Sequence, residues 1–182
     1  AGIFEDIRRP LKVRKDFSLG FVHQTGNAGM LVYGGKGKFT NTIDLSNNGL
    51  RCFGKIDYLN SIGETNDSYF FPDSANALLD SYVVKEQDKG TEFPSVVGDK
   101  VLMHWEPYND RMLVHSGQKP LRIFNEADLN GNVEITPSGA LAAGEINFEK
   151  AQIFSKKYSF KHHEILSDTL NFNLKSKDFD DL

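Results

Sequence analysis

The chain has 182 residues, of which 39% are hydrophobic and 25% are charged, with a formal net charge of −4. This composition is typical of a packed protein with one large domain or two small ones. The acidic balance argues against a dedicated nucleic-acid binder, which needs a basic surface to displace counterions. No apolar run approaches the roughly 18 residues of a membrane-spanning helix, and the single cysteine, Cys52, excludes an internal disulfide framework.

The two ends of the sequence carry no recognisable signal. The chain begins at AGIFEDIRRP, without an initiator methionine or the apolar core of a signal peptide, and stops at KDFDDL directly after a strand-like run. We interpret it as a processed product or as a fragment of a longer chain, with any targeting signal outside the sequence.

Alternation of apolar and polar residues recurs along the whole chain and predicts half-buried strands. Examples are residues 12–14, 55–58, 145–148 and 169–174, separated by runs rich in Gly, Asn, Asp and Ser. The best helix candidate is the segment PDSANALLDSY, residues 72–82, where an Asp or Ser could cap a short helix. The sequence therefore predicts an all-β fold in a single domain or a fragment of one.

Two distant stretches share one pattern of residue types without a gap. IDLSNNGLRCFGKIDY begins at Ile43, and VEITPSGALAAGEINF begins 90 residues later. Gly49 aligns with Gly139 and Gly54 with Gly144, and we expect these four glycines to be structural. The first glycine of each pair follows a turn sequence and can adopt a positive φ, and the second indicates a bulge or a close backbone approach.

We interpret the match as an internal repeat in which residues 37–62 echo residues 127–152, although alternation with glycine turns can also arise by coincidence. A repeat implies stacked strand–turn–strand units that cover one another's apolar faces. The expected architecture is an elongated β-roll, jelly-roll or solenoid-like stack, with a β-sandwich as the alternative. Cys52 falls opposite Ala142 of the second copy, which predicts a small buried residue.

Two short motifs resemble ligand loops but depart from them. GGKGKF, residues 34–39, lacks the Ser or Thr that follows Gly-Lys in a phosphate-binding loop, so we expect a turn between strands. DLNGNVE, residues 128–134, has glycine at its fourth rather than its sixth position, unlike an EF-hand loop. Its Asn130-Gly131 dipeptide is the commonest tight-hairpin sequence and predicts a hairpin tip there.

Residues 100–116, KVLMHWEPYNDRMLVHS, predict a hairpin with its turn at residues 107–110. In this register Glu106 faces Arg111, His104 faces Leu113 and Leu102 faces His115. The apolar face, which we expect to be buried, contains Val101, Met103, Trp105, Met112 and Val114.

The opposite face of this hairpin carries His104, Glu106 and His115. The two histidines are diagonal neighbours about 7–8 Å apart, within reach of a shared zinc with Glu106 as third ligand. We favour a polar outer face with a Glu106–Arg111 ion pair, and we expect no metal or cofactor. The adjacent His162 and His163 leave a strand on opposite faces and cannot easily share a metal.

No nucleophile signature is present in the sequence. It contains no Gly-x-Ser-x-Gly and no His-Glu-x-x-His, and Cys52 has no identifiable base. We therefore nominate no catalytic residue and expect a protein that is not an enzyme. A hydrolase with two carboxylates across a cleft is the remaining catalytic alternative.

The segment ILSDTLNFNLK, which begins at Ile165, resembles the recurring unit of the OstA-like periplasmic β-jelly-roll proteins that bridge lipopolysaccharide across the envelope. Ser167 stands where that family usually has Ala. TPSGALAAGEINF resembles the strand–turn units of AsmA/TamB-like envelope proteins, and the chain resembles parts of large envelope proteins of Bacteroidetes-type bacteria. The matching positions of the OstA-like unit are Ile165, Ser167, Asp168, Leu170, Phe172, Leu174 and Lys175.

The resemblance covers about a third of the chain and implies an elongated β-structure in the periplasm or outside the cell, with an apolar core or trough and no catalytic residue. The function we expect is a non-catalytic structural or binding segment of a cell-envelope or secreted protein that binds lipid or a partner. The remainder of a larger envelope protein, or a second copy through an edge strand, would be such a partner. The residues expected to line the core or trough are Ile146, Phe148, Phe160, Leu170 and Phe172.

The alternative function is a carbohydrate-binding β-sandwich module of a polysaccharide-degrading system. Exposed aromatic rings would carry that function by stacking on sugars. The candidate rings are Trp105, Tyr108, Tyr69 and Tyr82.

Overall fold

The computed structural model is nearly all β, which confirms the predicted fold class. It describes residues 12–13, 19–46, 49–86, 93–161 and 164–175. Within these ranges fifteen strands form one sheet, joined by turns that include two short 3₁₀ segments, and none of the described residues forms a helix long and apolar enough to cross a membrane. The elements are β1 (Lys12–Val13), β2 (Leu19–Gln24), β3 (Met30–Val32), η1 (Tyr33–Gly35), β4 (Gly37–Ser46), β5 (Gly49–Tyr58), β6 (Ser61–Phe70), β7 (Ala75–Val84), β8 (Val96–Glu106), η2 (Pro107–Asn109), β9 (Arg111–His115), β10 (Leu121–Ile123), β11 (Ala127–Thr136), β12 (Gly139–Asn147), β13 (Ala151–Lys161), β14 (Glu164–Leu166) and β15 (Asn171–Leu174).

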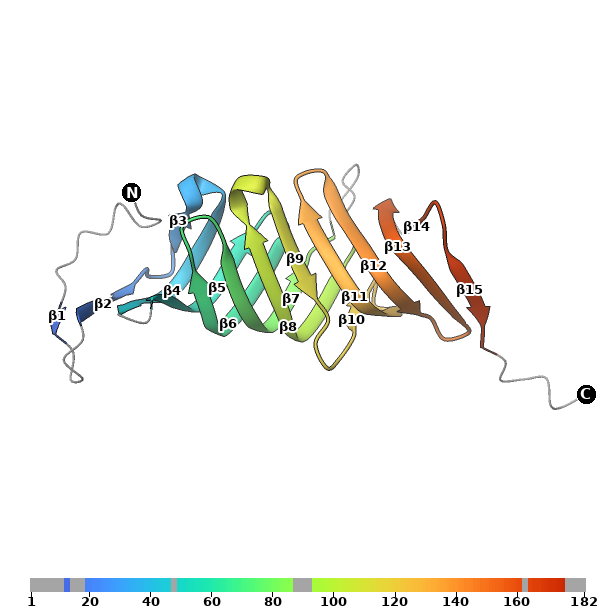
Figure 1. The fold of residues 1–182 in the computed structure, drawn as a ribbon, viewed down its shortest axis with the longest axis horizontal. Coiled ribbons are helices and arrows are strands. Elements are labelled where there is room, and N and C mark those ends of the chain that lie inside the picture. The colour runs from blue at the N-terminus through green and yellow to red at the C-terminus, as the bar shows by residue number, and fades with distance from the viewer. Residues whose placement is uncertain (1–11, 14–18, 47–48, 87–92, 162–163, 176–182) are drawn as a thin grey trace, which may run out of the picture.

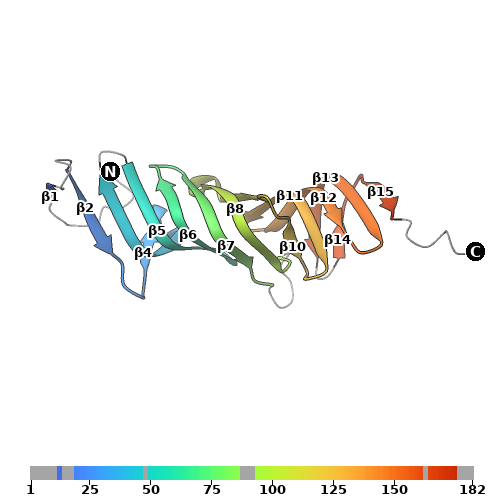
Figure 2. The same cartoon turned by 90° about the horizontal axis from the view of Figure 1, so that it is seen from below.

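The sheet is antiparallel and follows the chain along one long axis. Its main path runs β1-β2-β4-β5-β6-β7-β8-β10-β11-β12-β13-β14, and the short strands β3, β9 and β15 pair beside this path. The strands therefore cross an elongated body from one end to the other, with β1 and β15 at opposite ends (Figure 1). Seen from below, β4 to β8 lie side by side in chain order (Figure 2).

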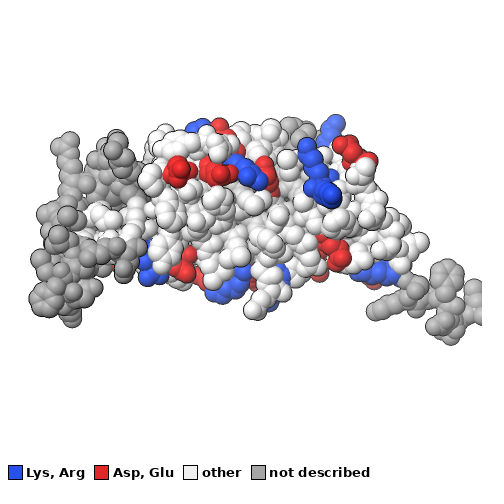
Figure 3. Space-filling view, viewed as in Figure 1, with Lys and Arg blue, Asp and Glu red and all other residues white. Residues whose placement is uncertain are grey.

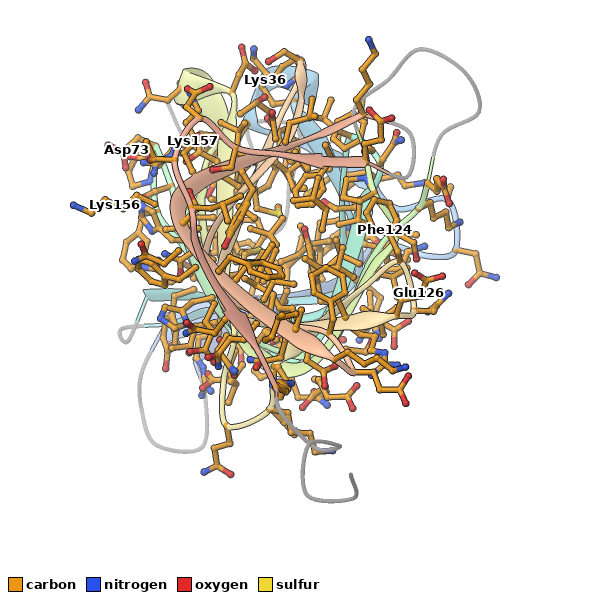
Figure 4. All side chains as sticks on the ribbon, turned by 90° about the vertical axis from the view of Figure 1, so that its right-hand side faces the viewer. Lys36, Asp73, Phe124, Glu126, Lys156 and Lys157 are labelled. Atoms are coloured by element: carbon orange, nitrogen blue, oxygen red, sulfur yellow. The ribbon has the colours of Figure 1, made fainter. Side chains whose placement is uncertain are left out.

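The sheet is folded lengthwise into two layers that face each other across the core. The long strands β4 to β8 and β11 to β13 bend near their middles, so the two halves of each strand lie in different layers. Viewed along the long axis, β13 turns near Lys156 and Lys157 and wraps around the interior side chains (Figure 4). The short strands belong to one layer each, because β2 pairs with the second half of β4 and β3 with its first half.

Glycines lie near the middle of β5, β11 and β12. Gly54 faces Asn41, and Gly144 faces Gly131. The register towards the next strand shifts beside both Gly54 and Gly144, where the sequence predicted a bulge. Their φ angles are 149° and 130°, and a Cβ would lie 2.1 Å from the Thr40 carbonyl oxygen at Gly54 and 2.3 Å from a backbone oxygen at Gly144. The predicted hairpin tip at residues 130–131 is wrong, because both residues lie inside β11.

Residues 37–84, the first unit, and residues 127–174, the second unit, have the same strand register at an offset of 90. Strands β4, β5 and β6 begin at residues 37, 49 and 61, and β11, β12 and β13 begin at residues 127, 139 and 151. The equivalence continues beyond these strands. The pair Phe70–Ala75 in the first unit corresponds to Phe160–Ile165 in the second. Strands β14 and β15 together therefore occupy the place that β7 has in the first unit.

The interior between the layers is packed with aromatic and aliphatic side chains. Trp105 is fully buried, with its ring centroid 5.0 Å from that of Tyr33 and 5.2 Å from that of Tyr58. Gly37 makes room for it, since a Cβ there would lie 2.5 Å from the indole. Cys52 is also fully buried beside this cluster, as expected for a small core residue. The largest fully buried side chains are Trp105, Tyr33, Tyr58, Tyr82, Tyr158, Phe39, Phe160, Ile43, Ile56, Leu79, Met112 and Leu121.

The helix predicted at residues 72–82 is wrong, because β7 begins at Ala75 and continues to Val84. Local helix propensity is outweighed here by pairing, since β7 lies between β6 and β8 and buries every second residue over its first half. The preceding residues form a turn instead, and Ser74 contributes its carbonyl oxygen to a 2.5 Å hydrogen bond donated by the Tyr33 hydroxyl.

The expected inward residues of the C-terminal third divide into two groups. Ile146 and Phe160 are fully buried, and Phe148 packs partly buried against the core. Leu170 and Phe172 are instead 47% and 55% exposed. The prediction that they line the core is therefore wrong. Phe172 lies on β15, which among the described residues pairs only with β13. Leu170 lies just before β15, at the position that the partly exposed Asp80 has in the first unit.

Candidate binding groove

The hairpin predicted at residues 100–116 is confirmed in register and in facing. β8 and β9 pair Glu106 with Arg111, His104 with Leu113 and Leu102 with His115, and a 3₁₀ turn begins at Pro107. The apolar face is buried throughout. The exposed fractions of Val101, Met103, Trp105, Met112 and Val114 are 0%, 3%, 0%, 2% and 0%.

The structure places His104, Glu106 and His115 on the outer face but not around a common point. Nε2 of His104 lies 3.8 Å from Glu106, while Nδ1 of the same ring lies 2.6 Å from the Asn76 side-chain oxygen. The His115 ring contacts the carbonyl of its own neighbour, Ser116, at 2.6 Å. Across the described ranges, no three His, Cys, Asp or Glu side chains are arranged to hold a metal ion.

Glu106 belongs instead to a surface ion-pair chain. Arg111 lies 3.3 Å from Glu106 and 3.0 Å from Glu134 on the next strand. These contacts, with the Glu134 hydrogen bond as the main cause, raise the pKa of the Arg111 guanidinium. The Glu106–Arg111 pair expected from the sequence is present, and its partners are exposed enough that it contributes at most about 1 kcal/mol.

A shallow groove of about 440 Å³ lies on the outer face of strands β6 to β9, and we call it the outer groove. Its floor is apolar, because Leu78, Leu102 and Leu113 occupy outward positions of their strands. Leu102 is 56% exposed and Leu78 is 38% exposed. The complete lining is Asp67, Tyr69, Asn76, Ala77, Leu78, Leu102, Met103, His104, Leu113 and His115.

One end of the outer groove carries a stacked aromatic group. The Arg51 guanidinium lies 5.2 Å from the ring centroids of both Phe53 and Tyr69. It also donates a 3.2 Å hydrogen bond to Asp67. Because this bond and the stacking fix the guanidinium, the Tyr69 ring is held in place while 36% of the residue stays exposed.

The rim of the outer groove is polar but holds little formal charge. Asn76 and His104 contact each other along one side, and His115 lies across from them. In Figure 3 charged side chains follow the upper and lower margins of the molecule, and uncharged ones fill the band between them. The groove therefore offers hydrogen-bonding groups beside an apolar floor.

The four aromatic rings proposed from the sequence do not form one platform. Trp105 and Tyr82 are fully buried, so they cannot contact a ligand and the prediction fails for both. Tyr108 is 59% exposed but lies in the β8–β9 turn, edge-on to Tyr33 with ring centroids 6.0 Å apart. Of the four, only Tyr69 lines the outer groove.

The outer groove also uses residues that sequence reasoning did not nominate. Leu78, Leu102 and Leu113 are apolar side chains at outward positions, where alternation predicts polar ones. This break in the alternation is the signal that could have identified the groove. Arg51 and Asp67 carried no comparable signal, because their contact across two neighbouring strands appears only with the fold.

A second depression, of about 400 Å³, lies along the bend of the sheet near Gly54 and Asn66. Two of its lining residues, Asn66 and Asp80, contact each other. Asn66 donates a 3.0 Å hydrogen bond to Asp80, which also pairs with Lys100. The Lys100 hydrogen bond is the main cause of the lowered pKa of the Asp80 carboxyl.

The buried ionisable groups are sealed from solvent rather than activated. Burial raises the pKa of the Cys52 thiol, so the unreactive protonated form dominates. Burial also raises the pKa of the Tyr33 and Tyr82 hydroxyls. The two histidines His162 and His163 lie outside the described residues, and the structure does not test their facing.

These features define an all-β protein with a closed core and an open groove on its outer face. Comparison of the chain with protein-family models, with curated proteins and with solved structures gives no match.

Proposed function

We propose that the protein is a non-catalytic structural or binding segment of a cell-envelope or secreted protein. The observation that carries the proposal is the contrast between the closed interior and the open outer groove. Ile146 and Phe160, which would line an internal trough, are fully buried in the core. A ligand is therefore expected on the outside of the sheet rather than between its layers.

The contacts of the outward titratable residues on the β8–β9 hairpin support a non-catalytic role. A catalytic base or nucleophile needs a free, positioned group with a tuned pKa. His104, Glu106 and His115 already contact Asn76, Arg111 and the Ser116 carbonyl. The thiol of Cys52 is buried.

The compartment in this proposal comes from the resemblance of residues 165–175 to the OstA-like unit. Fractionation of cells that produce the natural protein tests it, with an antibody raised against this chain and with cytoplasmic and envelope marker proteins as controls. We expect the chain in the envelope or the medium. Recovery with the cytoplasmic marker would contradict the proposal.

Glycan binding in the outer groove is the second candidate function, and the fixed Tyr69 ring favours it. Sugars present apolar ring faces that stack on aromatic side chains and hydroxyls that need hydrogen-bonding partners at the edge. The outer groove provides Tyr69 for stacking, with Asp67, Asn76 and His104 on the rim. A lipid chain would need a deeper apolar cavity to be covered.

Affinity electrophoresis against xylan, mannan, β-glucan and alginate tests this candidate. We expect retardation in at least one polysaccharide, with a loss of tenfold or more in affinity for Tyr69→Ala. Tyr108→Ala is the matched control, because Tyr108 is exposed but lies away from the groove lining. If no polysaccharide retards the protein, or if both variants lose binding equally, glycan binding in the groove is ruled out.

A further inference from the structure

Among the described residues, the C-terminal edge of the second unit lacks the partner strand that β7 has in the first unit. In the first unit β7 pairs with β6 on one side and with β8 on the other. In the second unit β14 and β15 pair with β13 in the same register. Among the described residues neither β14 nor β15 has a second partner strand.

Without that partner strand, apolar side chains whose counterparts are buried in the first unit remain exposed in the second unit. Tyr82 is fully buried and Val84 is 1% exposed where β8 pairs beside β7, with Gly98 opposite Tyr82 and Val96 opposite Val84. Ninety residues later, the equivalent Phe172 is 55% exposed and Leu174 is 74% exposed. Strand β15 therefore has apolar side chains at the positions that are buried beside a partner strand in β7.

The N-terminal end of the sheet has the short strands that correspond to those linking β8 to the second unit. Strand β8 also pairs with β9 and β10. These two short strands pair in turn with β11, the first strand of the second unit. Their counterparts at the N-terminal end are β2 and β3, each paired with β4 as β9 and β10 are paired with β11. The chain thus shows directly which kind of element joins two such edges, namely an extended strand of the β8 type.

We propose that the β14–β15 edge binds an extended polypeptide segment, which adds to the sheet as an antiparallel strand in the place that β8 has beside β7. A peptide is the fitting partner because an edge strand presents unpaired backbone N–H and C=O groups as well as apolar side chains, and only another backbone pairs with both. A lipid or a glycan would leave the backbone groups unmatched.

The register of the first unit specifies the side chains that the segment should carry. A small residue belongs opposite Phe172, as Gly98 lies opposite Tyr82, and an aliphatic residue belongs opposite Leu174. A large apolar residue belongs opposite Ile165, as Trp105 lies opposite Ala75. The partner therefore alternates apolar and polar residues over about ten positions, as β8 does.

The site is separate from the outer groove, so a failure of glycan binding leaves the inference unchanged. A labelled peptide with the sequence of β8, VVGDKVLMHWE, is the probe, and fluorescence anisotropy with the whole chain measures its binding. We expect saturable binding, at least tenfold tighter than for a scrambled peptide of the same composition. No binding at protein concentrations up to about 1 mM, or equal binding of both peptides, would overturn the proposal.

Two substitutions on the same edge separate strand addition from nonspecific contact. Phe172→Asn removes an inward side chain, and we expect it to weaken binding at least tenfold. Leu166→Asn is the matched control, because Leu166 is 44% exposed and its counterpart in the first unit, Asn76, stays exposed with β8 in place. Binding that survives Phe172→Asn, or that Leu166→Asn abolishes equally, contradicts the proposal.

Hydrogen exchange gives a readout that depends on no variant. The β8 peptide should slow amide exchange in residues 171–174 and leave the β8–β9 turn unchanged. Unchanged exchange in β15 at saturating peptide would refute strand addition. Self-association of the chain that Phe172→Asn abolishes would support it, and would identify a second copy as the donor of the strand.

Discussion

Gly54 lies opposite Asn41 at the bend between the two layers, and a Cβ at Gly54 would lie 2.1 Å from the Thr40 carbonyl oxygen. Its φ of 149° is also unfavourable for any residue with a side chain. We therefore expect Gly54→Ala to lower the free energy of unfolding by about 3 kcal/mol or more, because strain and a backbone clash act together. Urea denaturation followed by circular dichroism measures the change.

Gly49 is the matched control for this prediction, since its φ of 101° is positive but a Cβ there meets none of the described atoms within 4 Å. Gly49→Ala should cost only about 1–2 kcal/mol, from backbone strain alone. Equal costs at the two positions would show that close approach of the backbone is not what fixes glycine at the bend.

The sequence predicted the glycine positions at turns and bulges better than it predicted how the sheet folds into two layers. Residue type matched over residues 43–58 and 133–148 because both stretches bend, turn and bury the same faces. The division into two layers is less visible in the sequence, because Asn41 and Lys100 adopt positive φ values of 106° and 52° although neither is glycine. Such positions look like ordinary polar strand residues until their neighbours are in place.

Alkaline pH should unfold the protein through its buried tyrosines. Burial raises the pKa of Tyr58 to about 12 from 10.0, and it also raises the pKa of Tyr33, Tyr82 and Tyr158. Because the folded-state pKa values are raised, this contribution is fully present below pH 10 and is lost as the pH rises through 10 towards 12. Each such tyrosine should lower stability by up to about 1.4 kcal/mol per pH unit in that window.

Tyrosinate absorbance and circular dichroism, recorded together during a base titration, check this prediction. We expect the four buried tyrosines to ionise only as the β signal is lost. Tyr58→Phe should make the loss of stability less steep, and it should cost little at neutral pH, because the Tyr58 hydroxyl has no hydrogen-bond partner among the described residues. Ionisation of all tyrosines before any unfolding would contradict the assignment.

The candidate groove could be predicted only in part, because its residues come from separate strands. The hairpin at residues 100–116 was readable, since its buried positions are all apolar and its one turn fixes both its register and its faces. Tyr69 was nominated for its residue type, whereas its partner Arg51 is positioned by the pairing of β5 with β6. Phe172 takes the place that the buried Tyr82 has in the first unit, but burial also requires a neighbouring strand, and periodicity does not reveal whether one is present. Leu170 instead takes the place of Asp80, whose side chain is partly exposed and pairs with Lys100.

Gly37 and Trp105 should be coupled, because a Cβ at Gly37 would lie 2.5 Å from the Trp105 indole and 2.9 Å from the Asp57 carbonyl oxygen. We expect Gly37→Ala to lower the free energy of unfolding by about 1–3 kcal/mol through overpacking, and to shift the emission of the single tryptophan. In a Trp105→Phe background the same substitution should cost less, since the smaller ring leaves room for the methyl group. A double-mutant cycle measured by urea denaturation gives the coupling. An equal cost of Gly37→Ala in both backgrounds would place the strain in the backbone of β5 rather than in the contact with the indole.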